Sequence, residues 1–189
     1  MGEIKSTLEI AMEKAKAVEV SSEDRERFKR EEILAKARDI FLRFTRHPNR
    51  TMSVAAEVKR GGKDTPLLKE SLVEVFLEAL DPSDPSERIW KGLEELGLKK
   101  SDTFRKSLAN LAEEEKKAYE EQASKVERKI MESLGKSGIS GNAVDVNVEG
   151  STQWLDFLED LKKKNAAKLQ TLRQKIARAI TAGDGDSPR

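Results

Sequence analysis

The feature that most constrains this chain is a row of large side chains recurring every three or four positions near the C-terminal end. The intervals of 4, 3, 4, 4, 3, 4 and 4 residues are those of one face of an α-helix with an 11-residue repeat. The members of this seam are Trp154, Leu158, Leu161, Asn165, Leu169, Leu172, Ile176 and Ile180. So long a stripe predicts a helix over 152–182 that packs against another helix.

A second long helix is predicted over 101–134, where apolar residues from Phe104 to Leu134 follow a drifting stripe. About half of the chain is Ala, Glu, Lys, Leu or Arg, a composition typical of long helices and coiled coils. The glycine-rich segment 135–150 that joins the two helices is short, and short connections favour antiparallel neighbours. We therefore expect a long antiparallel helical hairpin over 101–182.

The remaining helices predicted from apolar periodicity and capping residues are shorter. The helix over 67–80 is apolar around much of its circumference, which indicates a position at the centre of a core. The expected fold is all-α. It consists of a helical N-terminal region over 1–100, the hairpin with its glycine-rich loop, and a disordered tail over 183–189.

One segment of the loop has the periodicity of a strand. Val144, Val146 and Val148 alternate with polar residues, so a short strand would place the three valines on one face. Such a strand could pair with an extended segment of a partner or with its own copy in a second chain. The alternative is a linker whose valines rest on a helix.

Residues that commonly carry chemistry are scarce. The chain contains no cysteine and a single histidine, His47, which lies next to Pro48 and among arginines. One imidazole without a thiol leaves few designs for nucleophilic or metal-based catalysis. We therefore expect a protein that is not an enzyme and that uses no cofactor, metal ion or small-molecule substrate.

The sequence also lacks the marks of a membrane or secreted protein. Residues 1–20 carry a charge every few positions, unlike a signal peptide. No window approaches the roughly 18 apolar residues of a membrane-spanning helix. These features predict a cytoplasmic protein without a membrane partner.

Charge is balanced overall, with 36 Lys and Arg against 35 Asp and Glu, but it is unevenly distributed. Glu70, Glu74 and Glu78 form an acidic strip, because residues four apart share one helix face. Three interpretations remain open for this strip. It holds a metal ion, it contacts an electrostatic partner within the chain or across an interface, or it is a solvated face.

Basic residues gather in two other places. No acidic residue occurs between Leu161 and Ala182, and a second cluster of positive charge extends over Arg43–Lys63. The members of the basic patch on the C-terminal helix are Lys162, Lys163, Lys164, Lys168, Arg173, Lys175 and Arg178. Such clusters suit the phosphates of nucleic acid and equally an acidic protein surface.

Asn165 interrupts the apolar seam of the last helix. A buried asparagine at such a position fixes the register and the number of partners in helical assemblies. The alternative is that the seam is locally hydrated at this point.

Two stretches are similar to known proteins. Glu32–Phe41 resembles the first helix of tetracycline-repressor-type DNA-binding domains, and Thr51–Val58 faintly resembles their second helix. That resemblance covers about 30 residues, and no recognition helix follows Gly61 and Gly62. Met1–Ile10 is similar to the start of some uncharacterised bacterial all-helical proteins, a resemblance that implies no activity.

The preferred hypothesis is a non-enzymatic helical interaction or structural protein that acts through helix packing, with itself or with a protein partner. The seam from Trp154 to Ile180 and the segment Val144–Val148 are its candidate contacts. The alternative hypothesis is a nucleic-acid-associated protein that uses the basic C-terminal helix and the Arg43–Lys63 cluster.

Overall fold

The computed structural model describes residues 6, 21–46, 52–84, 86–139 and 146–183. Within these ranges the chain forms six α-helices and one 3₁₀ helix, and it contains no strand. In chain order they are α2 (Ser22–Arg46), α3 (Val54–Lys59), η1 (Gly62–Asp64), α4 (Thr65–Glu78), α5 (Glu87–Glu95), α6 (Ser101–Lys136) and α7 (Thr152–Gly183). The all-α fold and the antiparallel hairpin are confirmed.

Helices α2–α5 form a helical head, in which α2 packs against α4. α2 begins after Ser21, whose hydroxyl oxygen accepts a hydrogen bond from the backbone N–H of Asp24 at 3.0 Å. The residues that α2 buries are Ile33, Ala37, Ile40 and Phe44. Phe76 of α4 meets the rings of Phe41 and Phe44 edge-on, with centroids 4.9 and 5.8 Å away. This aromatic cluster anchors α2 to the middle of the head.

α5 approaches α4 closely at Gly92, which is buried. A β-carbon at this position would lie 2.1 Å from the ring of Phe76, so a side chain has no room here. Near the C-terminal end of α5, the carboxylate of Glu95 accepts hydrogen bonds from the hydroxyl of Ser53 at 2.8 Å and the backbone N–H of Ala55 at 3.3 Å. Glu95 thus caps the short helix α3 from another part of the chain.

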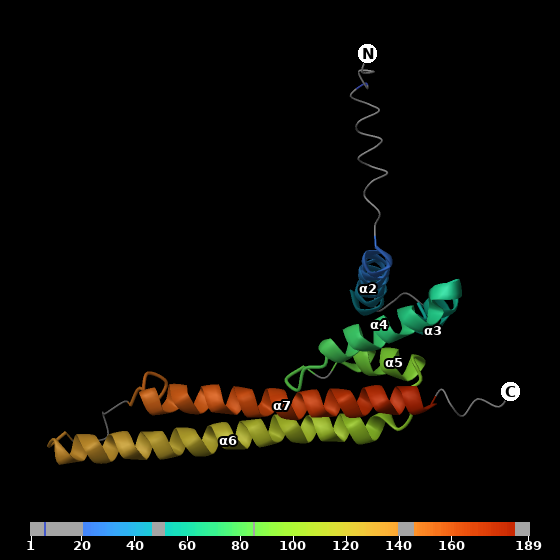
Figure 1. Cartoon of the computed structure of the whole chain (residues 1–189). Coiled ribbons are helices and arrows are strands. Elements are labelled where there is room, and N and C mark those ends of the chain that lie inside the picture. Colours follow the sequence, from blue (N-terminus) through green and yellow to red (C-terminus); the bar gives the residue numbers. More distant parts are fainter. Residues whose placement is uncertain (1–5, 7–20, 47–51, 85, 140–145, 184–189) are drawn as a thin grey trace.

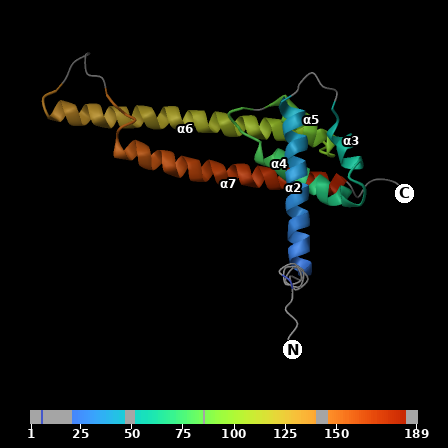
Figure 2. The same ribbon diagram turned by 90° about the horizontal axis from the view of Figure 1, so that it is seen from above.

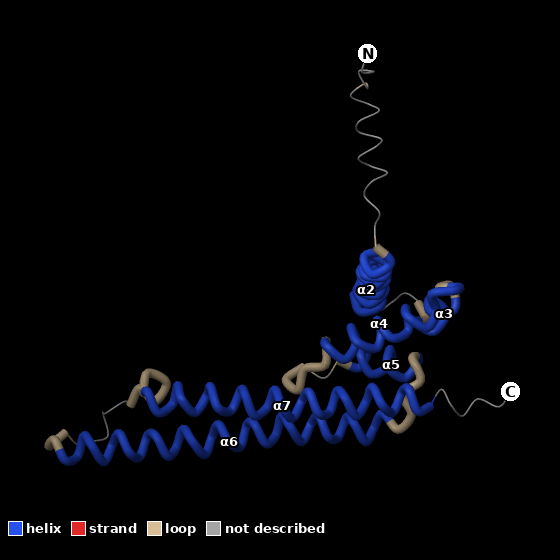
Figure 3. The backbone as a smooth tube through the Cα atoms, in the orientation of Figure 1, coloured by secondary structure: helices blue, strands red, loops and turns tan. Residues whose placement is uncertain are grey.

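α6 and α7 run antiparallel as the hairpin on which the head sits (Figures 1 and 3). At a rise of 1.5 Å per residue, they are about 54 and about 48 Å long. Figure 2 shows that α2 runs across the hairpin rather than along it. Leu108 of α6 and Leu172, Ile176 and Ile180 of α7 join the core of the head. One apolar core therefore holds the head on one half of the hairpin.

The other half of the hairpin extends past the head in both views (Figures 1 and 2). We call it the arm and define it as residues 120–136 of α6 and 152–167 of α7. Its two buried residues, Val126 and Trp154, do not belong to the core cluster of the head. Trp154 packs edge-on against Tyr119, with ring centroids 4.6 Å apart. The arm therefore has a small apolar core of its own.

The short strand predicted around Val144, Val146 and Val148 is wrong for the part that the structure describes. Val148 donates its backbone N–H to the carbonyl of Val146 at 3.0 Å, and Ser151 donates to the carbonyl of Val148 at 3.1 Å, so the chain turns here. The hydroxyl oxygen of Ser151 accepts a hydrogen bond from the N–H of Trp154 at 3.3 Å. Asn147, between Val146 and Val148, therefore belongs to a turn that enters α7, and Val144 and Asp145 lie outside the described residues.

Candidate interaction surfaces

The predicted seam of α7 faces the interior of the hairpin. Its fully buried members are Trp154, Leu172, Ile176 and Ile180, and its half-buried members are Leu158, Leu161, Asn165 and Leu169. These residues face α6 or the core of the head, so the seam holds this chain together and is not an open docking surface.

Asn165 keeps its place in the seam. Its amide nitrogen Nδ2 is enclosed and has no hydrogen-bond partner among the described residues. An enclosed water molecule would satisfy such an amide, so a locally hydrated seam also remains a prediction. A role in fixing register remains a prediction.

The basic patch is spread around α7 and is partly used inside the chain. Consecutive residues point about 100° apart on a helix, so the run of three lysines does not form one face. Lys163 pairs with Glu159 at 2.6 Å, and Lys168 pairs with Glu114 of α6 at 2.5 Å. The members without an ion pair to any described residue are Lys162, Lys164, Lys175 and Arg178.

Arg173, another member of the basic patch, binds the C-terminal end of α4. Its guanidinium Nη2 donates to the backbone carbonyls of Glu78 at 2.9 Å and Leu80 at 3.0 Å. The last carbonyls of a helix lack partners within the helix and carry partial negative charge, so a cation is favourable there. Arg173 therefore fastens the head to the hairpin.

We expect Arg173→Ala to destabilise the fold by about 1–2 kcal/mol, because charge-assisted hydrogen bonds to two carbonyls are lost. Arg178→Ala, which removes the same charge from an exposed position on the same helix, should stay within about 0.5 kcal/mol of the wild type. Urea unfolding followed by circular dichroism measures both variants. Equal midpoints for the two would contradict the role of Arg173.

The second basic cluster is also partly neutralised. Arg43 bonds to Asp39 at 2.9 Å, and Arg60 bonds to Glu57 at 2.5 Å. Arg50 of this cluster and the lone His47 lie outside the described residues.

The acidic strip lies on α4, along a groove of about 480 Å³ between α4 and α7. Glu70, Glu74 and Glu78 are exposed, and no described residue forms an ion pair with them. Val73 and Leu77 contribute the apolar part of this groove. Nowhere in the described ranges do three or more His, Asp or Glu side chains come together as a metal site would require.

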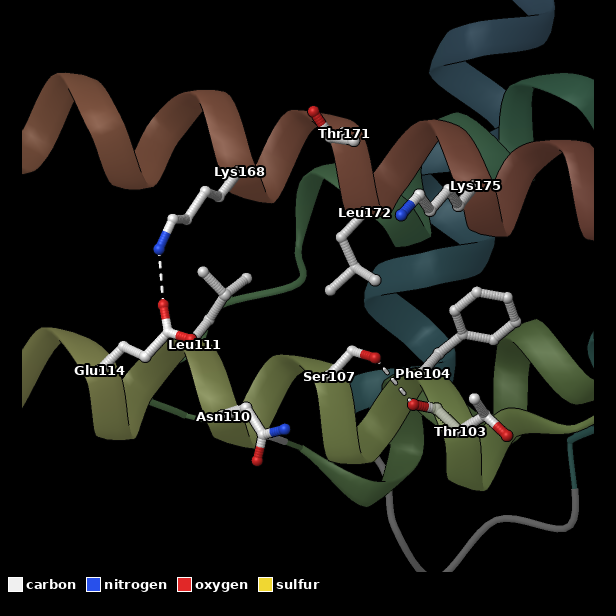
Figure 4. A pocket seen from close by; sticks show the side chains of 10 residues that line it. All are labelled: Thr103, Phe104, Ser107, Asn110, Leu111, Glu114, Lys168, Thr171, Leu172 and Lys175. Atoms are coloured by element: carbon white, nitrogen blue, oxygen red, sulfur yellow. Dashed lines mark hydrogen bonds and ion pairs between the residues drawn. The ribbon is translucent and has the colours of Figure 1, made fainter.

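A larger groove of about 550 Å³ lies between α6 and α7 on the head half of the hairpin (Figure 4). Its lining residues are Thr103, Phe104, Ser107, Asn110, Leu111, Glu114, Lys168, Thr171, Leu172 and Lys175.

Two hydroxyls of this groove already donate to helix carbonyls, Ser107 to Thr103 and Thr171 to Ala167, each at 2.9 Å. The Glu114–Lys168 pair crosses the groove (Figure 4). The hydrogen bond from Lys168 and its positive charge lower the pKa of Glu114. These contacts join the two helices, and among the described residues the groove brings together no set of nucleophile, base and orienting group.

Exposed apolar side chains on and beside the arm are the feature that sequence reasoning missed. Leu155 is 56% exposed, Tyr119 40% and Met131 39%. The sequence does contain a sign that Leu155 is exposed. Leu155 is a large aliphatic residue, and because it directly follows Trp154 it does not lie on the seam. In a two-helix arm, a residue that points away from the other helix is left exposed by the described part of the chain.

None of the helices in the described ranges combines the length and the apolar character needed to cross a bilayer. Comparisons of the chain with protein-family models, with curated proteins and with solved structures find no match. The geometry of the molecule is therefore the basis for its proposed function.

Proposed function

We propose that this chain is a non-enzymatic helical interaction protein whose arm is the docking element. The observation that carries the proposal is the division of one hairpin into two halves. One half carries the head, and the other half exposes apolar side chains on and beside the arm.

A two-helix arm has an energetic reason to bind a further helix. Two helices cover only part of each other, so the arm fully buries Val126 and Trp154 but leaves Leu155 more than half exposed. Burial of apolar surface stabilises association by about 25 cal/mol per Å². A partner helix laid along the arm would therefore gain apolar contacts that the hairpin cannot supply itself.

The nucleic-acid alternative receives less support from the contacts. Lys163, Lys168 and Arg173 of the basic patch are engaged within the chain, as are Arg43 and Arg60 of the second cluster. Phosphate binding would give retention on DNA or RNA that falls steeply with salt concentration. The proposal expects no such steep dependence.

A photo-crosslinking amino acid placed at position 155 and, in a separate variant, at position 42 tests the proposal in the protein's own cells. Leu42 of α2 is 41% exposed and lies on the head, so it is a matched control. We expect crosslinked protein adducts from position 155 and not from position 42. Absence of adducts from position 155, or the same adducts from both positions, would contradict a docking role for the arm.

A further inference from the structure

We propose that the groove between α4 and α7 docks a basic amphipathic helix of another protein. The inference goes beyond the proposed function, because none of the residues that line this groove belongs to the arm. Three features of the described residues carry it. The groove has an apolar floor, its rim on α4 is the acidic strip without ion pairs, and its wall on α7 supplies no cation to that rim.

The groove lies where α4 and α7 run antiparallel. Arg173 of α7 binds the carbonyls at the C-terminal end of α4. Further along both helices, a β-carbon at Gly97 would be 3.8 Å from Nζ of Lys69 in α4 and 4.0 Å from Cγ2 of Ile180 in α7. Each helix lines the groove with residues three or four positions apart, which lie on one face.

Apolar side chains form the floor of the groove. Val73 and Leu77 come from α4 and Ala177 from α7, and Leu77 is only 7% exposed. A groove between two helices is a common docking site for the apolar face of a third helix, whose anchors recur every three or four residues. The groove, of about 480 Å³, is large enough to receive side chains of such a helix.

The rim of the groove on α4 is the acidic strip. At a rise of 1.5 Å per residue, its three glutamates follow one another at intervals of about 6 Å. All three are exposed, and none forms an ion pair with a described residue. Glu87 and Glu94 of the head, by contrast, both bind the guanidinium of Arg105, and Glu95 caps α3. The acidic strip is therefore negative charge that the described contacts of the head do not use.

The acidic strip is unfavourable for the isolated chain. Like charges four residues apart on a helix repel each other, and the strip contains two such pairs. Glu78 is also the last residue of α4, where a negative charge opposes the helix dipole. Cations laid along the strip would remove both costs. Departures from local rules are expected at functional sites, so a strip of this kind beside an apolar floor has the character of a recognition surface.

The wall on α7 does not supply these cations. Its groove residues are neutral except for Arg173, whose guanidinium donates to the backbone carbonyls at the end of α4. Lys175 lines the other groove of this helix, between α6 and α7 (Figure 4). The described part of the basic C-terminal helix thus leaves the rim without a counter-charge, and a partner is its source.

The complementary helix has the pattern of α4 with its charges reversed. Lysine or arginine at positions i, i+4 and i+8 of the partner would face the three carboxylates at the same intervals. Apolar residues at i+3 and i+7 lie on the neighbouring face and would reach Val73, Leu77 and Ala177. Exposed ion pairs are individually weak, so we expect a dissociation constant of about 0.1–1 mM for a single short helix at low salt.

Nuclear magnetic resonance of the isotope-labelled full chain tests the site. The probe is an alanine-based helical peptide with lysines at i, i+4 and i+8 and leucines at i+3 and i+7. We expect shift changes concentrated in 70–78 and 170–177. The dissociation constant should rise several-fold between about 20 and about 200 mM salt, because salt screens exposed charges. Shift changes centred elsewhere, or none up to about 2 mM probe, would overturn the proposal.

Neutralisation of the acidic strip isolates the role of charge. The triple variant Glu70→Gln, Glu74→Gln, Glu78→Gln should bind the probe at least about tenfold more weakly, since three ion pairs are lost. Its Tm should be about 1–2 °C above that of the wild type, because the repulsion within the strip is removed. Weaker binding by a variant that is at least as stable cannot come from unfolding.

The control is a second triple variant, Glu127→Gln, Glu132→Gln, Glu149→Gln. It changes the net charge by the same amount at exposed positions outside the groove. Its dissociation constant for the probe should match that of the wild type. Equal weakening in the two triple variants would overturn the site, because binding would then follow net charge alone.

Gln174 tests whether α7 forms the second wall of the site. This side chain is exposed and lines the groove, so its charge can be changed without disturbing the core. Gln174→Glu should tighten binding of the probe about threefold, and Gln174→Lys should weaken it by a similar factor. Unchanged affinity in both variants would overturn a site between the two helices.

A second probe tests the helical form of the partner. It carries the same charges, but prolines prevent it from forming a helix. It should bind more weakly than the first probe, and equal binding would overturn a helical partner. These measurements do not depend on crosslinking from position 155, so the groove and the arm are tested separately.

Discussion

Gly92→Ala should destabilise this protein by about 2 kcal/mol, although alanine is the better helix former. The added β-carbon would lie 2.1 and 2.4 Å from two ring carbons of Phe76, far inside van der Waals contact. Phe76 is fully buried and is held by the rings of Phe41 and Phe44, so it has little room to move. At the upper end of its usual range, overpacking of this kind costs about 3 kcal/mol of folding free energy. The higher helix propensity of alanine offsets about 1 kcal/mol of this cost, which leaves a net loss of about 2 kcal/mol.

Gly135→Ala is the matched control, because Gly135 also lies within a helix but has no neighbouring atom within 4 Å of the added β-carbon. At position 135 alanine adds helix propensity without any steric clash, so we expect a stabilisation of about 0.5–1 kcal/mol. Thermal unfolding measures both variants, and the loss at position 92 corresponds to a decrease of about 4–8 °C in Tm for a chain of this size. A Gly92→Ala protein at least as stable as the wild type would contradict the close packing of α5 on α4.

The long helices could be predicted from the sequence because their signal is local. The seam from Trp154 to Ile180 repeats over eight positions, and a period of that length distinguishes a helix from a strand without any knowledge of the partner. The apolar helix predicted over 67–80 likewise lies at the centre of the head, and its Leu68, Leu72 and Phe76 are fully or almost fully buried. Periodicity thus predicts which side of an element is covered.

The residues that cover each side of a helix are set by contacts between distant parts of the chain. Periodicity carries no information about such contacts. Arg173 was interpreted as part of a basic patch, but it lies 95 residues from Glu78 in sequence and binds its carbonyl oxygen. The alternation of Val144, Val146 and Val148 left a short strand and a linker open, because so short a pattern does not separate a strand from a turn that enters a helix. Leu155 does not stand out in the sequence, because it lies beside the seam and not on it.

Trp154→Ala should unfold the arm while leaving the head folded. Trp154 is 2% exposed and packs between Tyr119 and Phe157, with ring centroids 4.6 and 5.7 Å away. Truncation of a buried tryptophan costs about 3–5 kcal/mol, and the arm has only one other fully buried residue, Val126, to resist the loss. The core of the head does not include Trp154, so its own contacts are conserved.

Hydrogen–deuterium exchange resolves this local effect, because amides open with the free energy of the unit to which they belong. In the Trp154→Ala protein, we expect fast exchange over 120–136 and 152–167 and wild-type protection in α4 and α5. Leu155→Ala is the adjacent control, and it should change exchange little, since Leu155 is 56% exposed. Loss of protection throughout the head of the Trp154→Ala protein would show that head and arm unfold as one unit. In that case the arm would not be an independently packed element.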